Sequence, residues 1–186
     1  MTNYLIISSS IRTNRLSHRV ALFFENYIQE NDLGTSEIFD LDKADFPLFD
    51  ERLSNKKNPS DKMLQFSEDV QKNDAIIIVT PEYNGGYPAS LKNAIDLLYP
   101  EWYKKPTAIA TVSDGNFGGT QVIYSLQFSL WKMRAWVVPV RFPVPNVDKA
   151  YSENGVPSNP KLSNNKAKVL FEELDWAVEA KKRMAD

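Results

Sequence analysis

The run Asp-Ala-Ile-Ile-Ile-Val-Thr at residues 74–80 constrains the fold more than any other segment of the chain. Its centre is an uninterrupted series of apolar, mostly β-branched residues, and such a series predicts a strand that is covered on both faces. A strand of this kind belongs in the middle of a parallel sheet, because the crossover connections of parallel strands place helices on both faces. The segment therefore favours an α/β fold.

Apolar runs and helical patterns alternate along the rest of the chain, as they do in parallel α/β folds. Further strands are expected at residues 3–8, 36–41, 107–113 and 135–140. Apolar residues spaced by three and four predict helices at about 16–28, 61–73, 91–98, 119–133 and 164–182, with long loops at 42–61 and 141–163. The pattern predicts a five-stranded parallel sheet with helices on both faces.

Composition excludes several classes of function. The 186 residues include no cysteine, so disulfides, thiolate nucleophiles and iron–sulfur clusters are excluded, and a single histidine, His18, rules out a multi-histidine metal site. A formal net charge of -2 gives no footprint for nucleic acid. We expect no signal peptide, no membrane span and a cytoplasmic location.

Ligands of open parallel sheets bind at the carboxyl ends of the strands, so the loops after the first, third and fourth strands are the places to look. The first is Ser-Ser-Ser-Ile-Arg-Thr-Asn-Arg-Leu-Ser, residues 8–17, which leads into a helix. Its hydroxyl groups, the guanidinium of Arg12 and the helix N-terminus suit a phosphate. The alternative is that Ser17 merely caps the helix and the arginines are solvated.

The second loop, Pro-Glu-Tyr-Asn-Gly-Gly at residues 81–86, offers backbone amides and the ring of Tyr83 to a planar aromatic ligand. Its alternative is a tight turn with a surface tyrosine. The third loop, residues 113–120, contains Gly115, Gly118 and Gly119. It suits an anion or the edge of a ring, and its alternative is a flexible turn before a helix.

Other residues suggest structural roles. We expect His18 on the surface and Trp131 and Trp136 in the core. The segment Tyr-Pro-Glu-Trp-Tyr, residues 99–103, follows a helix end with little core left to fill. It suggests a subunit interface or the rim of a pocket.

Residues 81–98, Pro-Glu-Tyr-Asn-Gly-Gly-Tyr-Pro-Ala-Ser-Leu-Lys-Asn-Ala-Ile-Asp-Leu-Leu, resemble the signature of the NADPH-dependent FMN reductase family. The first loop is similar to the family pattern Gly-Ser-x-Arg-x-x-Arg-x-Ser, and the third to Ser-x-Gly-x-x-Gly-Gly. The chain departs from these patterns at Ser9 and Asp114. The resemblance implies a flavodoxin-like three-layer sandwich formed by a single FMN-binding domain, residues 1–186.

Carried over by position, the resemblance also implies a binding site. Three residues of the first loop would hold the FMN phosphate, the second loop would support the flavin ring, and two residues of the third loop would flank it. The residues that would hold the phosphate are Ser10, Arg12 and Ser17. Those that would support the ring are Pro81, Glu82, Tyr83 and Asn84, and those that would flank it are Ser113 and Gly115.

The implied activity is hydride transfer from NADPH or NADH to FMN, and from there to a small acceptor such as a flavin, a quinone, an azo compound or a metal oxyanion. No catalytic side chain and no metal are required. The resemblance also implies a homodimer or homotetramer, for which Tyr99–Tyr103 is the candidate interface. Two alternatives remain, an electron-transfer flavodoxin-like protein without NAD(P)H activity and a non-catalytic binding module with the flavin fold.

Overall fold

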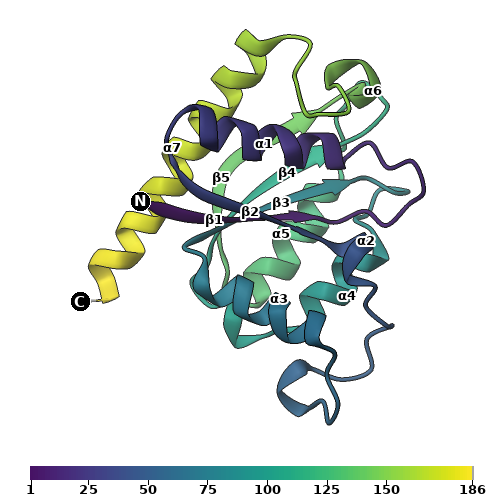
Figure 1. Cartoon of the computed structure of the whole chain (residues 1–186), viewed down its shortest axis with the longest axis vertical. Helices are drawn as coiled ribbons and strands as arrows, with labels where there is room; N and C mark the ends of the chain where they lie inside the picture. The colour runs from purple at the N-terminus through teal and green to yellow at the C-terminus, as the bar shows by residue number, and fades with distance from the viewer. Residues whose placement is uncertain (186) are drawn as a thin grey trace.

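The computed structural model describes residues 1–185 and contains a parallel sheet of five strands in the order β2-β1-β3-β4-β5 (Figure 1). All five predicted strands are present, which confirms the flavodoxin-like α/β fold class. Their bounds are β1 (Thr2–Ser8), β2 (Gly34–Asp40), β3 (Ala75–Pro81), β4 (Pro106–Val112) and β5 (Trp136–Val144). Every residue of β3 and of β4 is buried, as the apolar runs predict.

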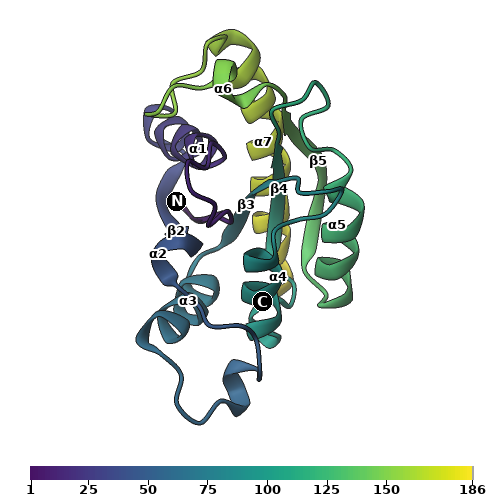
Figure 2. The same cartoon turned by 90° about the vertical axis from the view of Figure 1, so that its right-hand side faces the viewer.

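Helices cover both faces of the sheet, so the molecule has three layers (Figures 1 and 2). One face carries α1 (His18–Glu30) and α7 (Pro160–Ala185). The other carries α3 (Asp61–Lys72), α4 (Ala89–Leu97) and α5 (Val122–Lys132). Alternate residues of β1 and β3 contribute to the two apolar cores, because successive side chains of a strand point to opposite faces.

The strand order changes direction at β1, and this positions the candidate site. The chain leaves β1 for β2 on one side and then returns to place β3 on the other side. The loops that leave β1 and β3 therefore diverge to opposite faces of the sheet, and the space between them is where such folds bind ligands.

Both segments predicted as long loops contain short elements. Residues 42–61 include most of α2 (Leu41–Ala44) and the 3-10 turn η1 (Leu53–Asn55), and residues 141–163 include the end of β5 and α6 (Val147–Ala150). Strand β5 continues despite two prolines, because it is an edge strand and its register with β4 shifts near Pro139. Another 3-10 turn, η2 (Pro100–Trp102), follows α4.

The predicted locations of three tryptophans were wrong. Trp102, expected at an interface or a pocket rim, is completely buried, and its indole nitrogen donates a hydrogen bond to the carbonyl of Ile95 over 3.2 Å. Trp131 and Trp136, expected in the core, are 67% and 37% exposed. Trp102, in the turn η2 after α4, therefore completes the core on this face of the sheet. The outer side of α5, which carries Trp131, stays exposed to solvent.

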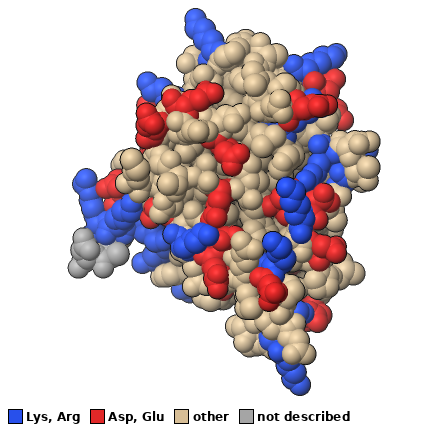
Figure 3. Space-filling view, in the orientation of Figure 1, with Lys and Arg blue, Asp and Glu red and all other residues tan. Residues whose placement is uncertain are grey.

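No helix among the described residues is both long enough and apolar enough to cross a membrane. On the face shown in Figure 3, lysine and arginine side chains are interspersed with aspartate and glutamate. This face has no extended area of one charge sign.

Candidate functional site

The loops that follow β1, β3 and β4 meet at the carboxyl edge of the sheet, as the sequence predicts, and enclose a hollow of about 280 Å³. Half of its lining comes from the first loop, and the rest comes from the ends of β3 and β4, the two loops that follow them, and α6. The lining residues are Ser10, Arg12, Thr13, Asn14, Arg15, Leu16, Ser17, Pro81, Glu82, Tyr83, Val112, Ser113, Asp114 and Val147.

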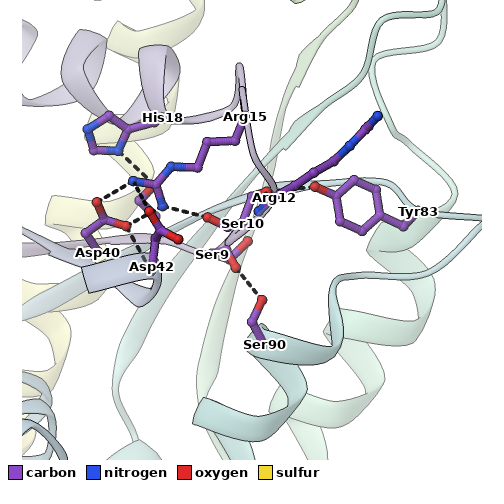
Figure 4. A network of polar contacts seen from close by, with 10 residues as sticks. Ser9, Ser10, Arg12, Arg15, His18, Asp40, Asp42, Tyr83 and Ser90 are labelled. Atoms are coloured by element: carbon purple, nitrogen blue, oxygen red, sulfur yellow. Dashed lines mark hydrogen bonds and ion pairs between the residues drawn. The ribbon is translucent and has the colours of Figure 1, made fainter. Parts of the chain in front are cut away.

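The first and second loops are joined through two hydroxyl groups. The Oγ atom of buried Ser10 lies 2.7 Å from the phenol oxygen of Tyr83 (Figure 4). The same Oγ accepts a hydrogen bond from the backbone N–H of Arg12 over 3.3 Å. Ser10 therefore fixes both the position of the tyrosine side chain and the turn that presents Arg12.

The two arginines of the first loop have different environments. Arg15 forms a bidentate ion pair with Asp40 at the end of β2, with both N···O distances at 2.5 Å, and also donates to the carbonyl of Ser10 over 2.6 Å. Arg12 is exposed and extends away from this pair toward the side on which Tyr83 lies (Figure 4). Its guanidinium forms no ion pair with any residue that the structure describes. Arg12 therefore remains available to an anion, whereas Arg15 anchors the loop.

The hydroxyl of Ser17 is buried in the hollow without a partner. Ser17 is 3% exposed, and its Oγ makes no hydrogen bond with any described residue. It precedes α1 but does not cap it, so the alternative of a simple helix cap is not what the structure shows. A buried hydroxyl without a partner costs about 1–3 kcal/mol, which a ligand oxygen in the hollow would recover. The residues present therefore fit a phosphate group.

The second loop is a tight turn, so the alternative that the sequence left open for this loop is correct for its backbone. Tyr83 and Gly86 exchange N–H···O bonds of 2.8 and 3.0 Å, and Asn84 and Gly85 between them have φ values of 52° and 80°. Positive φ at both central positions is typical of a two-residue Asn-Gly hairpin turn. Tyr83 is not a free surface residue, however, because the turn directs its ring to Ser10. Asn84 lies at the tip of the turn, outside the lining of the hollow.

Glu82 connects the second loop to the third. Its backbone N–H donates to the carbonyl of Val112 over 3.2 Å, and its carboxylate accepts from the backbone N–H of Gln121 over 3.1 Å. The side chain that precedes the tight turn thus holds the start of the α5 segment. Pro81, Glu82 and Tyr83 of this segment line the hollow.

Close packing accounts for two of the three glycines in the third loop. A Cβ atom at Gly118 would lie 2.9 Å from the backbone nitrogen of Val144, and one at Gly119 would lie 3.0 Å from the carbonyl oxygen of Val112. Both residues also have positive φ, 63° and 72°, which favours glycine. The loop therefore lies directly on the strand ends.

The remaining part of the third loop is more open. The hydroxyl of Ser113 donates to the carbonyl of Gly115 over 3.2 Å, and the backbone N–H of Val147 donates to the carbonyl of Ser113 over 3.2 Å. Ser113 and Asp114 line the hollow, whereas Gly115 lies just outside it. The sequence did not indicate Val147, because it lies in a short helix within a segment predicted as a loop.

His18 is half-buried at the start of α1, so it is only partly exposed on the surface where the sequence placed it. Its Nδ1 lies 3.0 Å from the hydroxyl oxygen of Ser8 at the end of β1. Burial lowers the pKa of the imidazole, although the nearby carboxylate of Asp40 acts in the opposite direction. His18 does not line the hollow, and its contact with Ser8 supports a structural role beside the first loop.

A parallel sheet in the order β2-β1-β3-β4-β5 with helices on both faces is the flavodoxin-like architecture, in which ligands bind at the point where the strand order reverses. The sequence profile of the family described as NADPH-dependent FMN reductase matches residues 2–149. The chain belongs to this family, which confirms the resemblance. It is therefore an oxidoreductase of the FMN- and NAD(P)H-dependent type, and neither the electron carrier nor the non-catalytic module is favoured.

Individual relatives agree with this assignment. The chain is 34% identical over 155 residues to an NAD(P)H-dependent FMN reductase of Saccharomyces cerevisiae, covering 75% of this chain and 80% of that protein. It is 31% identical over 196 aligned residues to an NAD(P)H-dependent FMN reductase of Schizosaccharomyces pombe, and the alignment covers 98% of this chain and 83% of that protein. Its fold is similar to that of the flavoenzyme NAD(P)H:(acceptor) oxidoreductase FerB of Paracoccus denitrificans. That structure has a TM-score of 0.77 at 22% identity, with 96% and 98% of the two chains covered.

Proposed function

We propose that the hollow at the carboxyl edge of the sheet is the FMN site of an NAD(P)H-dependent reductase formed by the whole chain as one domain. The observation that supports this placement is the pairing of a buried, partnerless Ser17 hydroxyl with an unpaired Arg12 guanidinium at one hollow. A phosphate would satisfy both, because it combines negative charge with several acceptor oxygens.

The residues then divide into two groups. Ser10, Arg12 and Ser17 hold the phosphate. Three parts of the chain are placed beside the ring: the segment Pro81–Glu82–Tyr83, the turn residue Asn84, and the third-loop residues Ser113 and Gly115.

When bound, FMN supplies the redox chemistry, taking a hydride from NADPH or NADH and passing two electrons to a small acceptor. The protein binds and orients. Arg12 balances the phosphate charge, and the tight turn at Tyr83–Gly86 holds backbone groups in fixed positions beside the ring. The acceptor is a flavin, a quinone, an azo compound or a metal oxyanion. The protein acts in the cytoplasm as a homodimer or homotetramer.

A comparison of two ligands tests the phosphate assignment. FMN and riboflavin share the ring and differ in the phosphate, so Arg12→Ala should weaken FMN binding at least tenfold and change riboflavin binding less than twofold. The matched control is Arg141→Ala, because Arg141 is also exposed but lies on β5 outside the hollow. Affinities are measured by quenching of flavin fluorescence. Equal losses for both ligands would refute the assignment of the first loop.

Enzymatic activity is tested separately by one anaerobic spectrum. The FMN-loaded protein is mixed with NADPH and then with NADH, and the flavin band near ~450 nm is followed. Rapid bleaching is expected with at least one of them. A band that persists with both nucleotides would contradict reductase activity while leaving the binding site intact.

A further inference from the structure

A second hollow, of about 410 Å³, lies between α4, α5 and the segment that leads into η1. We call it the α4–α5 pocket. It is larger than the hollow assigned to FMN and has no lining residue in common with it. Its size is typical of sites for small molecules, which measure about 300–1,000 Å³. The pocket is therefore a separate site, and FMN binding leaves its role open.

The lining of the α4–α5 pocket combines aromatic rings with positive charge. It includes three aromatic, three basic and one acidic side chain: Phe49, Tyr99, Phe128, Arg52, Lys92, Lys132 and Asp96. Lys92 and Asp96 form an ion pair with each other. Arg52 and Lys132 form no ion pair with any residue that the structure describes. The pocket therefore offers two uncompensated positive charges beside aromatic surface.

Contacts within the chain hold the wall of the pocket in place. The side-chain oxygen of Asn93 on α4 accepts a hydrogen bond from the backbone N–H of Phe49, and its amide donates to the carbonyl of Pro47 over 2.7 Å. The guanidinium of Arg52 lies 4.6 Å from the centroid of the Tyr99 ring, a cation–π contact that keeps its charge at the pocket. The site is thus preorganised, which lowers the entropic cost of binding a ligand.

The pocket lies close to the second loop. Helix α4 begins at Ala89, and Lys92 lies three residues into it, which is about 5 Å along the helix axis. The phenol oxygen of Tyr87 lies 2.9 Å from the hydroxyl oxygen of Ser129, which lines the pocket. A nicotinamide ring placed on a flavin at the second loop therefore leaves the adenosine end of the same dinucleotide within reach of the pocket.

We propose that the α4–α5 pocket binds the adenosine 2′-phosphate end of NADPH. Adenine is a planar aromatic ring that Phe49 and Phe128 contact. The 2′-phosphate has a charge of about −1.5 to −2 at pH 7, and Arg52 and Lys132 supply the opposite charge. NADH has a hydroxyl at that position and gains no charge-assisted contact, so the pocket makes the chain prefer NADPH. The inference rests on the proposed function, because the nicotinamide must reach bound FMN.

The distribution of basic residues supports this position for the phosphate. Residues 81–91 contain no basic residue, and residues 115–131 contain no charged residue. Lys92 and Lys132 are therefore the first basic residues after the second and third loops, and both line the pocket. Tyr99 lines it too, which favours the rim of a pocket over a subunit interface for this tyrosine.

Calorimetry with fragments of the nucleotide tests the pocket directly. Adenosine 2′,5′-bisphosphate is the probe, and adenosine 5′-monophosphate is the matched ligand without the 2′-phosphate. The full chain is saturated with FMN, so that the probe does not occupy the first hollow. The bisphosphate should bind at least tenfold more tightly than the monophosphate. Arg52→Ala and Lys132→Ala should each weaken its binding at least fivefold.

Two control variants show where the probe binds. Lys161→Ala should leave its affinity unchanged, because Lys161 is exposed on α7, on the opposite face of the sheet. An equal loss in Arg12→Ala would place the probe in the first hollow and overturn the proposal. Equal affinity for the two fragments, or no binding of the bisphosphate, would overturn it as well. Circular dichroism shows whether the variants fold.

Steady-state kinetics with the two nucleotides tests specificity. The KM for NADPH should rise at least tenfold in Arg52→Ala, while the KM for NADH changes less than twofold. Arg52→Lys keeps the charge and should restore most of the affinity for NADPH. Equal KM values for NADPH and NADH in the wild type would refute the proposal. A protein that neither nucleotide reduces would contradict the proposed function, whereas the calorimetric result decides on the pocket by itself.

Discussion

Replacement of Asp40 by asparagine is the sharpest perturbation of the first loop. The Arg15 and Asp40 side chains are only 14% and 5% exposed, and Asp40→Asn leaves the guanidinium buried without its bidentate partner. Removal of one member of a buried ion pair costs about 3–5 kcal/mol. Asp42 lies 3.6 Å from the same guanidinium and is half exposed, so it compensates in part, and we expect a loss of about 3 kcal/mol. This is a large part of the ~5–15 kcal/mol that stabilises most domains.

Urea denaturation followed by circular dichroism measures this loss. The double variant Arg15→Met with Asp40→Leu is the informative control, because an apolar pair of similar volume should restore stability to within about 1 kcal/mol of the wild type. FMN affinity should nevertheless fall in the double variant, because Arg15 also holds the carbonyl of Ser10. A loss below about 1 kcal/mol for Asp40→Asn would show that Arg15 is solvated in solution, which would refute the anchoring role assigned to it.

Two further predictions concern the third loop and a buried lysine. Gly118→Ala should lower the free energy of unfolding by about 1–3 kcal/mol in urea titrations, because its Cβ would lie 2.9 Å from the nitrogen of Val144 and φ is 63°. Gly115→Ala, whose nearest contact would be 4.0 Å away, should change it by less than about 0.5 kcal/mol, and equal effects would contradict this account. Burial lowers the pKa of Lys105 to about 8, so the folded state releases this proton before the unfolded state does. The contribution of Lys105 to stability therefore rises between pH 8 and its ordinary pKa of 10.5, by at most about 1.4 kcal/mol per pH unit. Urea midpoints measured between pH 8 and 10.5 should therefore rise with pH in the wild type and not in Lys105→Met. Parallel pH profiles for the two proteins would contradict the lowered pKa of Lys105.

The difference between the two arginines of the first loop illustrates a limit of sequence analysis. The pattern Ser-x-Arg-x-x-Arg-x-Ser places both near a phosphate, but it contains nothing that tells which of them is already neutralised. The partner of Arg15 is Asp40, which lies 25 residues further along the chain. The two meet because β2 pairs with β1, so the distinction is a consequence of strand order.

The backbone of the second loop could be anticipated from its sequence, but the contacts of its side chains could not. Its backbone is the tight turn that the sequence allowed only as an alternative, with positive φ at Asn84 and Gly85, which few residues adopt without strain. The role of Tyr83 depended on its contact with Ser10, which is 73 residues distant in the sequence. The role of Glu82 as a tie to Gln121 had no local signal either.

Local sequence determined the strands, the main helices, and the three polar loops at the strand ends, because hydrophobic periodicity and backbone preference act within a few residues. Motif order was enough to identify the family. Only the tertiary structure decided that Trp102 completes the core while Trp131 lies outside, since α5 has apolar residues on both sides and periodicity cannot show which side meets the sheet. It also decided that, in the first loop, the hydroxyls of Ser9 and Ser17 and the guanidinium of Arg12 remain without partners, because pairing depends on elements that are distant in the chain and adjacent in space.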